Sequence, residues 1–69
     1  MSAATVTAAA LGRAAHAAGR ARFAGADAEL MRVEAEQPTS AAKCAVMTAW
    51  LRAYDACVIA DLMTCEDES

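Results

Sequence analysis

The sequence predicts an all-α protein, built as a helical hairpin or a small three-helix bundle and completed by dimerisation. Three observations support this class. Ala, the strongest helix former, accounts for 21 of the 69 residues. No stretch alternates apolar and polar residues as a half-buried strand does. Breaks near Gly25 and Pro38 divide the chain into helical stretches at about 4–24, 27–36 and 40–65, followed by an acidic tail at 66–69.

The chain is short enough for one domain, which we place over residues 1–69. Apolar residues make up 58% of it, but the many Ala side chains have little surface to bury. A chain of this size also buries a smaller share of its surface than a larger domain does. We therefore expect self-association, or docking on a larger partner, to complete the core.

The first helix begins with Ser2 or Thr5 as its N-cap, and Gly25 is its C-terminal stop. Its interior contains Gly12 and Gly19, seven residues apart and hence on one face. With the surrounding Ala residues they form a smooth surface. This pattern predicts that another helix packs closely against it.

The second stretch has Asp27 as its N-cap and forms either a short helix or a partly ordered connector. Pro38 disfavours a helical conformation at Gln37, so the stretch ends there. Thr39 or Ser40 can cap the helix that follows.

The third helix has a wide apolar arc, which at 100° per residue covers about 80°. Its members are Cys44, Met47, Leu51, Tyr54, Val58, Leu62 and Cys65. Trp50 extends the arc on one side, and Ile59 and Met63 interrupt the sparsely polar opposite face. The only Trp and the only Tyr are thus spaced four residues apart. We interpret them as anchors for another helix, either of this chain or of a partner.

Charge is divided unevenly along the chain. Residues 1–26 carry three Arg and no acid, giving +3, whereas residues 27–69 carry nine acids against three basic residues, giving −6. The acidic total disfavours non-specific nucleic-acid binding, which depends on Lys and Arg neutralising phosphates. The asymmetry favours two oppositely charged segments that fold against each other, or a partner with a basic surface.

The sequence gives no support for catalysis, a metal or a cofactor. Cys44, Cys57 and Cys65 form no C-x-x-C pair, and the single His16 lies far from them, so we expect no zinc site. No nucleophile elbow or Gly-rich phosphate loop is present. We expect reduced thiols packed as small apolar groups, and a cytoplasmic protein with no membrane span.

Two groups of polar residues are candidate sites. The candidate partner-binding residues on the third helix are Trp50, Tyr54, Asp55 and Asp61. Asp61 falls within the apolar sector, where a carboxylate needs a partner or solvent. Its candidate partners are Lys43, Arg13, Arg20 or a basic residue of another protein. The candidate anion- or RNA-contacting residues are Arg13, His16, Arg20 and Arg22, for which the alternative is a solvated basic face that balances the acidic third helix.

Two short motifs resemble ribosome modulation factor and its small relatives. "AHAAGRARFAG" at 15–25 is similar to the spaced-glycine end of that family's first helix, and "WLRAY" at 50–54 is similar to its Trp motif. The matching residues are Gly19, Phe23, Gly25, Trp50 and Tyr54. The resemblance implies a two-helix protein that associates with the ribosome or RNA.

From these features we expect a small, non-catalytic regulatory or inhibitory protein of bacterial or phage type. It would act by binding a larger protein or nucleoprotein complex, by analogy in size and charge with anti-CRISPR inhibitors. One alternative is the ribosome- or RNA-associated modulator that the resemblance implies. Another is a helical structural subunit of a larger assembly.

Overall fold

Three α-helices and a short 3₁₀ turn form the chain in the computed structural model, which describes the backbone of residues 2–68 and the side chains of residues 2–63. The elements are α1 (Ala3–Ala17), η1 (Ala24–Ala26), α2 (Ala28–Ala35) and α3 (Ser40–Glu68). No strand occurs within the described backbone, so the predicted all-α class is confirmed. The acidic tail expected at 66–69 lies outside the described side chains.

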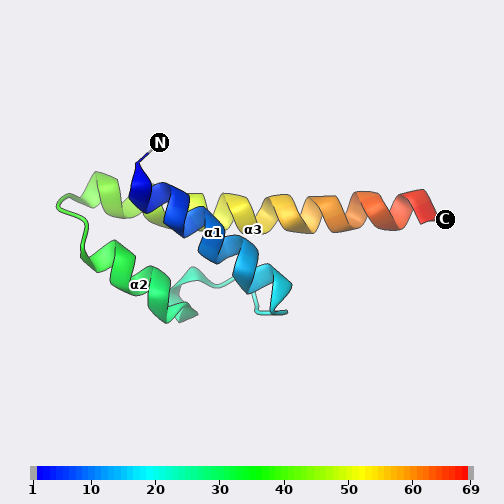
Figure 1. Cartoon of the computed structure of the whole chain (residues 1–69), viewed down its shortest axis with the longest axis horizontal. Coiled ribbons are helices and arrows are strands. Elements are labelled where there is room, and N and C mark those ends of the chain that lie inside the picture. Colours follow the sequence, from blue (N-terminus) through cyan, green and yellow to red (C-terminus); the bar gives the residue numbers. More distant parts are fainter. Residues whose placement is uncertain (1, 69) are drawn as a thin grey trace.

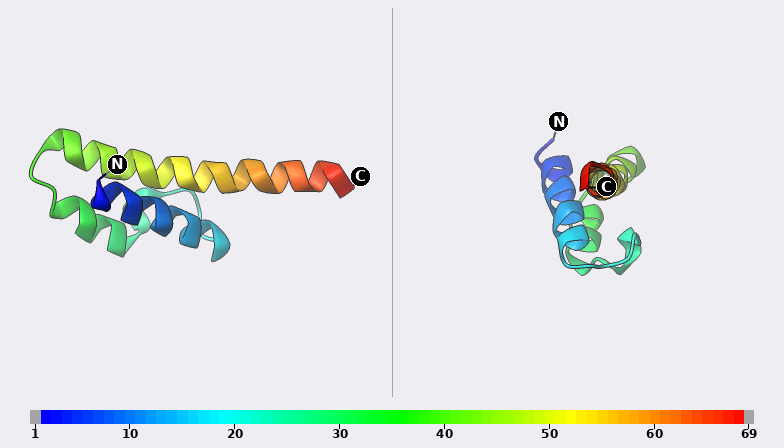
Figure 2. Two further views of the ribbon diagram at one scale, coloured as in Figure 1. Left: turned by 45° about the horizontal axis from the view of Figure 1, so that its top comes forward. Right: turned by 90° about the vertical axis from the view of Figure 1, so that its right-hand side faces the viewer.

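The helices α1 and α3 run in the same general direction, and α2, which lies between them in the sequence, runs in the opposite direction (Figure 1). Of the two predicted arrangements, the three-helix one is therefore observed. A hairpin of the first and third helices is not observed. The helix α2 reverses the chain direction, so α3 runs parallel to α1 and not antiparallel to it. Seen end-on, α1 and α2 lie to one side of α3 and below it (Figure 2). The molecule measures 47 × 22 × 15 Å because α3 continues past the end of α1.

Ser2 caps the start of α1, where its Oγ accepts a hydrogen bond from the Thr5 N–H at 3.2 Å. The helix ends at Ala17, so the predicted continuation to residue 24 is wrong. Gly19 adopts a left-handed conformation with φ of 73°. The N–H groups of Gly19 and Arg20 then donate to the carbonyls of His16 and Ala15, the pattern of a Schellman cap.

At Gly12, α1 comes into close backbone contact with α3. A Cβ built on it would lie 2.4 Å from the Trp50 carbonyl oxygen, closer than real Cβ atoms come. The predicted close packing of a second helix is thus confirmed at Gly12. Gly19 has no heavy atom within 4 Å of an added Cβ, so its role is conformational and not a packing one.

The buried side of α3 follows the stripe Val46, Trp50 and Tyr54, which are 1%, 1% and 9% exposed. These residues repeat every four positions and pack with Leu30 of α2 and Ala8 of α1. The predicted apolar arc was centred to one side of this stripe, on residues that include Cys44 and Leu62, and both of these are exposed. The approach of α1 at Gly12 decides which side of α3 is covered.

Candidate functional site

Trp50 is used inside the chain and is not available to a partner. Its indole Nε1 donates to Oδ2 of Asp27 at 3.0 Å. The other oxygen, Oδ1, accepts from the N–H groups of Glu29 and Leu30 at 3.1 Å and caps α2. Asp27 is 6% exposed, so one buried carboxylate both starts α2 and holds Trp50. The sequence identified the cap, but not the bond to Trp50, which joins residues 23 positions apart.

Tyr54 continues the same cluster toward the loop after α1. Its ring stacks on Trp50 with a centroid distance of 5.3 Å, and the edge of His16 meets it at 5.4 Å. Its hydroxyl donates to the backbone carbonyl of Arg20. Both predicted anchor rings therefore pack against the chain's own elements. The four-residue spacing of Trp50 and Tyr54 therefore reflects the packing of α3 against α1 and the loop that follows α1.

The two acids of the candidate partner-binding group are paired with residues of the candidate basic group. The Arg22 guanidinium holds Asp55 in a two-point contact, with Nε–Oδ1 at 2.6 Å and Nη2–Oδ2 at 2.9 Å. These hydrogen bonds lower the pKa of Asp55 and raise the pKa of Arg22. His16 Nε2 lies 3.0 Å from Oδ2 of Asp61. The expected partners of Asp61 did not include His16, which reaches it from the last turn of α1.

The two predicted groups are thus brought together, which fits the interpretation that oppositely charged segments fold against each other. Asp61 keeps a side chain that is 69% exposed, so it does not lie in an apolar interior as the helical wheel suggested. Arg13 and Arg20 are exposed. Cys44 and Cys57 are free thiols, but Cys44 is exposed and so is not packed as a small apolar group. Cys65 lies outside the described side chains.

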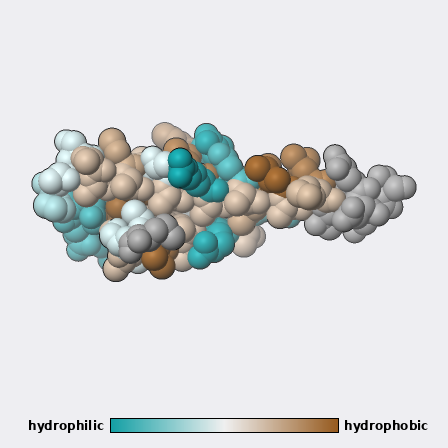
Figure 3. Space-filling view, turned by 90° about the horizontal axis from the view of Figure 1, so that it is seen from above, coloured by the Kyte–Doolittle hydropathy of each residue, from teal (hydrophilic) through white to brown (hydrophobic). Residues whose placement is uncertain are grey.

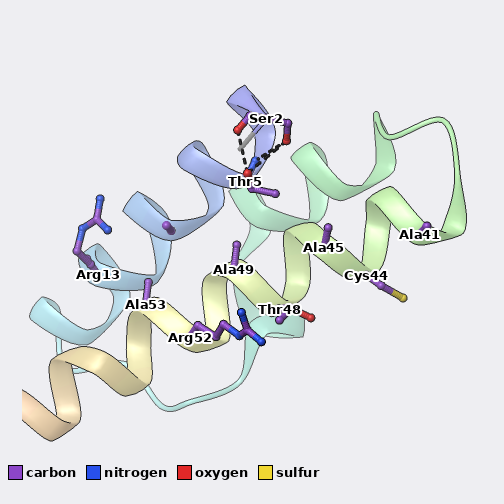
Figure 4. A pocket seen from close by; sticks show the side chains of 11 residues that line it. Ser2, Thr5, Arg13, Ala41, Cys44, Ala45, Thr48, Ala49, Arg52 and Ala53 are labelled. Atoms are coloured by element: carbon purple, nitrogen blue, oxygen red, sulfur yellow. Dashed lines mark hydrogen bonds between the residues drawn. The ribbon is translucent and has the colours of Figure 1, made fainter.

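A groove of about 790 Å³ runs between α1 and α3 (Figure 4). Small residues form most of its walls, and two guanidinium groups, from Arg13 and Arg52, stand at one end. The lining residues are Ser2, Thr5, Ala9, Arg13, Ala41, Cys44, Ala45, Thr48, Ala49, Arg52 and Ala53. Because the groove is open and its two charged side chains are both Arg, its chemistry suits an anionic segment.

The most apolar exposed surface lies on α3 beyond the body of the molecule. We call residues 59–63 the projecting segment. Within it, Ile59, Leu62 and Met63 are 57%, 61% and 62% exposed. Figure 3 shows brown side chains on this part of the surface, beside the teal residues of the body. The sequence placed Ile59 and Met63 on the polar face, so this patch was missed as a candidate site.

The spacing of the patch was the signal that could have identified it. Residues 59, 62 and 63 are related by i, i+3 and i+4, so they lie on one side of a helix. Asp61 points to the opposite side, where it contacts the end of α1. The projecting segment therefore presents an apolar side to solvent and a polar side to the body.

Among the described residues, no group of His, Cys, Asp and Glu side chains is arranged to hold a metal ion. None of the helices searched there is long and apolar enough to cross a membrane. No protein-family model, curated protein or solved structure matches this chain. The resemblance to ribosome modulation factor stays a prediction.

Proposed function

We propose that this protein is a small, non-catalytic regulator that binds a larger protein through the projecting segment of α3. The observation that carries this proposal is the exposure of Ile59, Leu62 and Met63 on a helix that extends past α1 and α2. Contiguous exposed apolar side chains are typical of interaction sites. An apolar helix face with i, i+3 and i+4 anchors binds by lying in a hydrophobic groove of its partner.

The negative charge of this part of the chain indicates which residues would surround the partner's groove. From residue 60 onward the sequence has four acids, at 61, 66, 67 and 68, and no basic residue. A partner that surrounds its hydrophobic groove with Lys or Arg would complement this segment and exclude competitors with acidic rims. The larger partner is thus expected to be a protein, or a nucleoprotein complex that exposes such a groove.

The biological role that fits these features is inhibition or modulation of bacterial or phage machinery in the cytoplasm. A rigid helix that occupies a working groove can block it without chemistry. The ribosome- or RNA-associated alternative has less support, because Arg22 and His16 face carboxylates of α3. The dimerisation expected from the composition stays a proposal.

The test is affinity purification from the native host with matched variants. Ile59→Glu combined with Leu62→Glu should abolish recovery of the partner and leave the helical circular-dichroism spectrum unchanged, because both side chains are solvent-exposed. Val6→Glu is the control, since Val6 is an exposed apolar residue (51%) on α1. Recovery in this control should equal that of the wild type.

Three outcomes would overturn the proposal. If nuclease treatment and Arg13→Ala with Arg20→Ala abolish recovery while the apolar variants bind, the RNA-associated alternative is correct. If Val6→Glu and the double Glu variant bind equally well, the projecting segment is not the contact. A chain that is insoluble when expressed alone and soluble only with other subunits would identify a structural subunit.

A further inference from the structure

We infer that the groove between α1 and α3 is a second docking surface, which binds an acidic α-helix of another protein. Three features of the groove define this occupant: its charge, the shape of its walls and the bonding of their backbone. The groove is separate from the projecting segment, because its wall on α3 runs from Ala41 to Ala53 and ends before Ile59. A ligand can therefore bind here independently of the partner proposed above.

The groove is basic, although the whole chain is acidic. Its α1 wall contributes the guanidinium of Arg13, and its α3 wall contributes that of Arg52 (Figure 4). Among the described residues, neither guanidinium has an ion-pair partner. Residues 3–17 and 40–54, which form the walls, carry three Arg or Lys and no acid, giving +3 with His neutral, against −3 for the chain. A ligand that carries carboxylates is therefore complementary to the groove, and a basic one is repelled.

The walls have the shape that a third helix requires. On α3 an Ala lines the groove at every fourth position from Ala41 to Ala53. These positions extend over about 18 Å, the length of about three helical turns. Side chains this small let the backbone of another helix approach, as α1 approaches α3 at Gly12. The groove therefore suits a helix of about 12 residues.

The bonding of the walls disfavours an extended peptide. Both walls are α-helical, so most of their backbone N–H and C=O groups are bonded within each helix. The hydroxyls of Ser2 and Thr5 bond to each other at 3.3 Å. An extended segment against the Ala methyl groups would leave its own backbone groups without partners, which is costly. A helix bonds its own backbone and needs only carboxylates level with the two guanidiniums.

Nucleic acid is the other anionic ligand that two guanidiniums attract. None of the residues described as lining the groove is aromatic, so bases would have no ring on which to stack. Affinity from phosphates alone requires several Lys and Arg contacts, and the groove supplies two guanidiniums. An acidic protein helix is therefore the better fit.

The first test selects binders from a library of random 14-residue peptides displayed on phage, with the purified chain as bait. Enriched peptides should carry Asp or Glu at one end and apolar residues with i, i+3 and i+4 spacing. As synthetic peptides they should become helical on binding, measured by circular dichroism. They should bind the variant Ile59→Glu with Leu62→Glu as tightly as the wild type, because the projecting segment is not their site.

A steric pair of variants then locates the selected peptide. Ala45→Leu places a larger side chain at an exposed position in the groove and should weaken binding by about 10-fold or more. Ala10→Leu makes the same change at an exposed position of α1 outside the groove and should leave binding unchanged. Fluorescence anisotropy of the labelled peptide measures both affinities.

A charge pair of variants tests the complementarity. Arg13→Gln combined with Arg52→Gln should weaken binding by about 10-fold in low salt, and the loss should shrink at 1 M salt. The control Arg32→Gln removes an exposed positive charge on α2 and should have little effect.

Enrichment of basic or Pro-rich peptides, or of none, would overturn the inference, as would a selected peptide whose affinity is unaffected by Ala45→Leu. Binding of a single-stranded RNA 12-mer that is lost in the double Arg variant, with no peptide enriched, would assign the groove to nucleic acid instead. These failures are distinct from failure of the proposed function. A chain that binds no peptide in the groove but still captures its partner through Ile59 and Leu62 would retain that function.

Discussion

In the first half of α3, large apolar side chains are covered by α1, α2 and the turn between them, whereas in the second half Ile59, Leu62 and Met63 face solvent. Trp50 is 1% exposed and Leu62 is 61% exposed, although both belong to one continuous helix. The difference arises outside α3. The end of α1 meets the projecting segment on its Asp61 side, and no described element lies against Ile59, Leu62 and Met63 on the other side. The covered half stabilises the fold, and the uncovered side is the one that we propose as a contact surface.

The largest expected effect comes from testing the covered half at Trp50. Trp50→Ala leaves a cavity and removes the partner of a buried Asp27 oxygen, which together cost about 3–5 kcal/mol. A 69-residue domain has a total stability of only about 3–10 kcal/mol, so this variant should lose from about a third of its stability to all of it. Circular dichroism during urea unfolding measures the loss.

Leu62→Ala is the matched control in the uncovered half. It should change the free energy of unfolding of the monomer by less than about 0.5 kcal/mol, because the side chain is exposed. The measurement is made at low protein concentration, so that self-association does not contribute to the result. Equal losses for Trp50→Ala and Leu62→Ala would contradict the division of α3 into a covered and an uncovered half.

The sequence predicted the helical class, the cap at Asp27 and the close approach at Gly12, because each depends on local chemistry. It placed the end of the first helix at Gly25 and Gly19 in its interior, and both predictions were wrong. The left-handed conformation at Gly19 ends α1 instead. The projecting segment was missed for the same reason: periodicity shows that apolar residues share a side of a helix, but not whether another element covers that side.

Gly12 within α1 and Gly19 just after its end provide the next two predictions, whose expected effects are of intermediate size. Gly12→Ala should destabilise the body by about 1–3 kcal/mol, since its Cβ would meet backbone atoms of Trp50 that cannot move without separating the helices. This steric cost exceeds the gain of about 1 kcal/mol in helix propensity.

Gly19→Ala tests a different cost at the end of the same helix. Its Cβ would meet nothing within 4 Å, so only the left-handed backbone is strained, at about 1 kcal/mol. Urea unfolding should therefore rank Gly12→Ala below Gly19→Ala in stability. The reverse order would show that α1 and α3 are not held at backbone distance.

The smallest expected effect is a pH dependence at the boundary between the two halves, where Arg22 holds Asp55. The hydrogen bonds from Arg22 lower the pKa of Asp55 in the folded chain. The pair therefore stabilises the fold above the unfolded pKa of Asp, about 3.9, and its contribution is lost as pH falls through the lowered folded value. Both side chains are about half exposed, so the effect should be small and should shrink with added salt.

Thermal unfolding of the wild type and Asp55→Asn between pH 2 and pH 7 measures this contribution. The wild type should have the higher melting temperature from about pH 5 upward, and the difference should narrow as the pH falls below about 4. Glu36→Gln, which removes an exposed acid at the end of α2, controls for a general change in net charge. A difference between wild type and Asp55→Asn that stays constant down to pH 2 would show that Asp55 does not hold the loop to α3 through its charge. The boundary would then rest on the remaining contacts there, the Tyr54 hydroxyl with the Arg20 carbonyl and His16 with Tyr54 and Asp61.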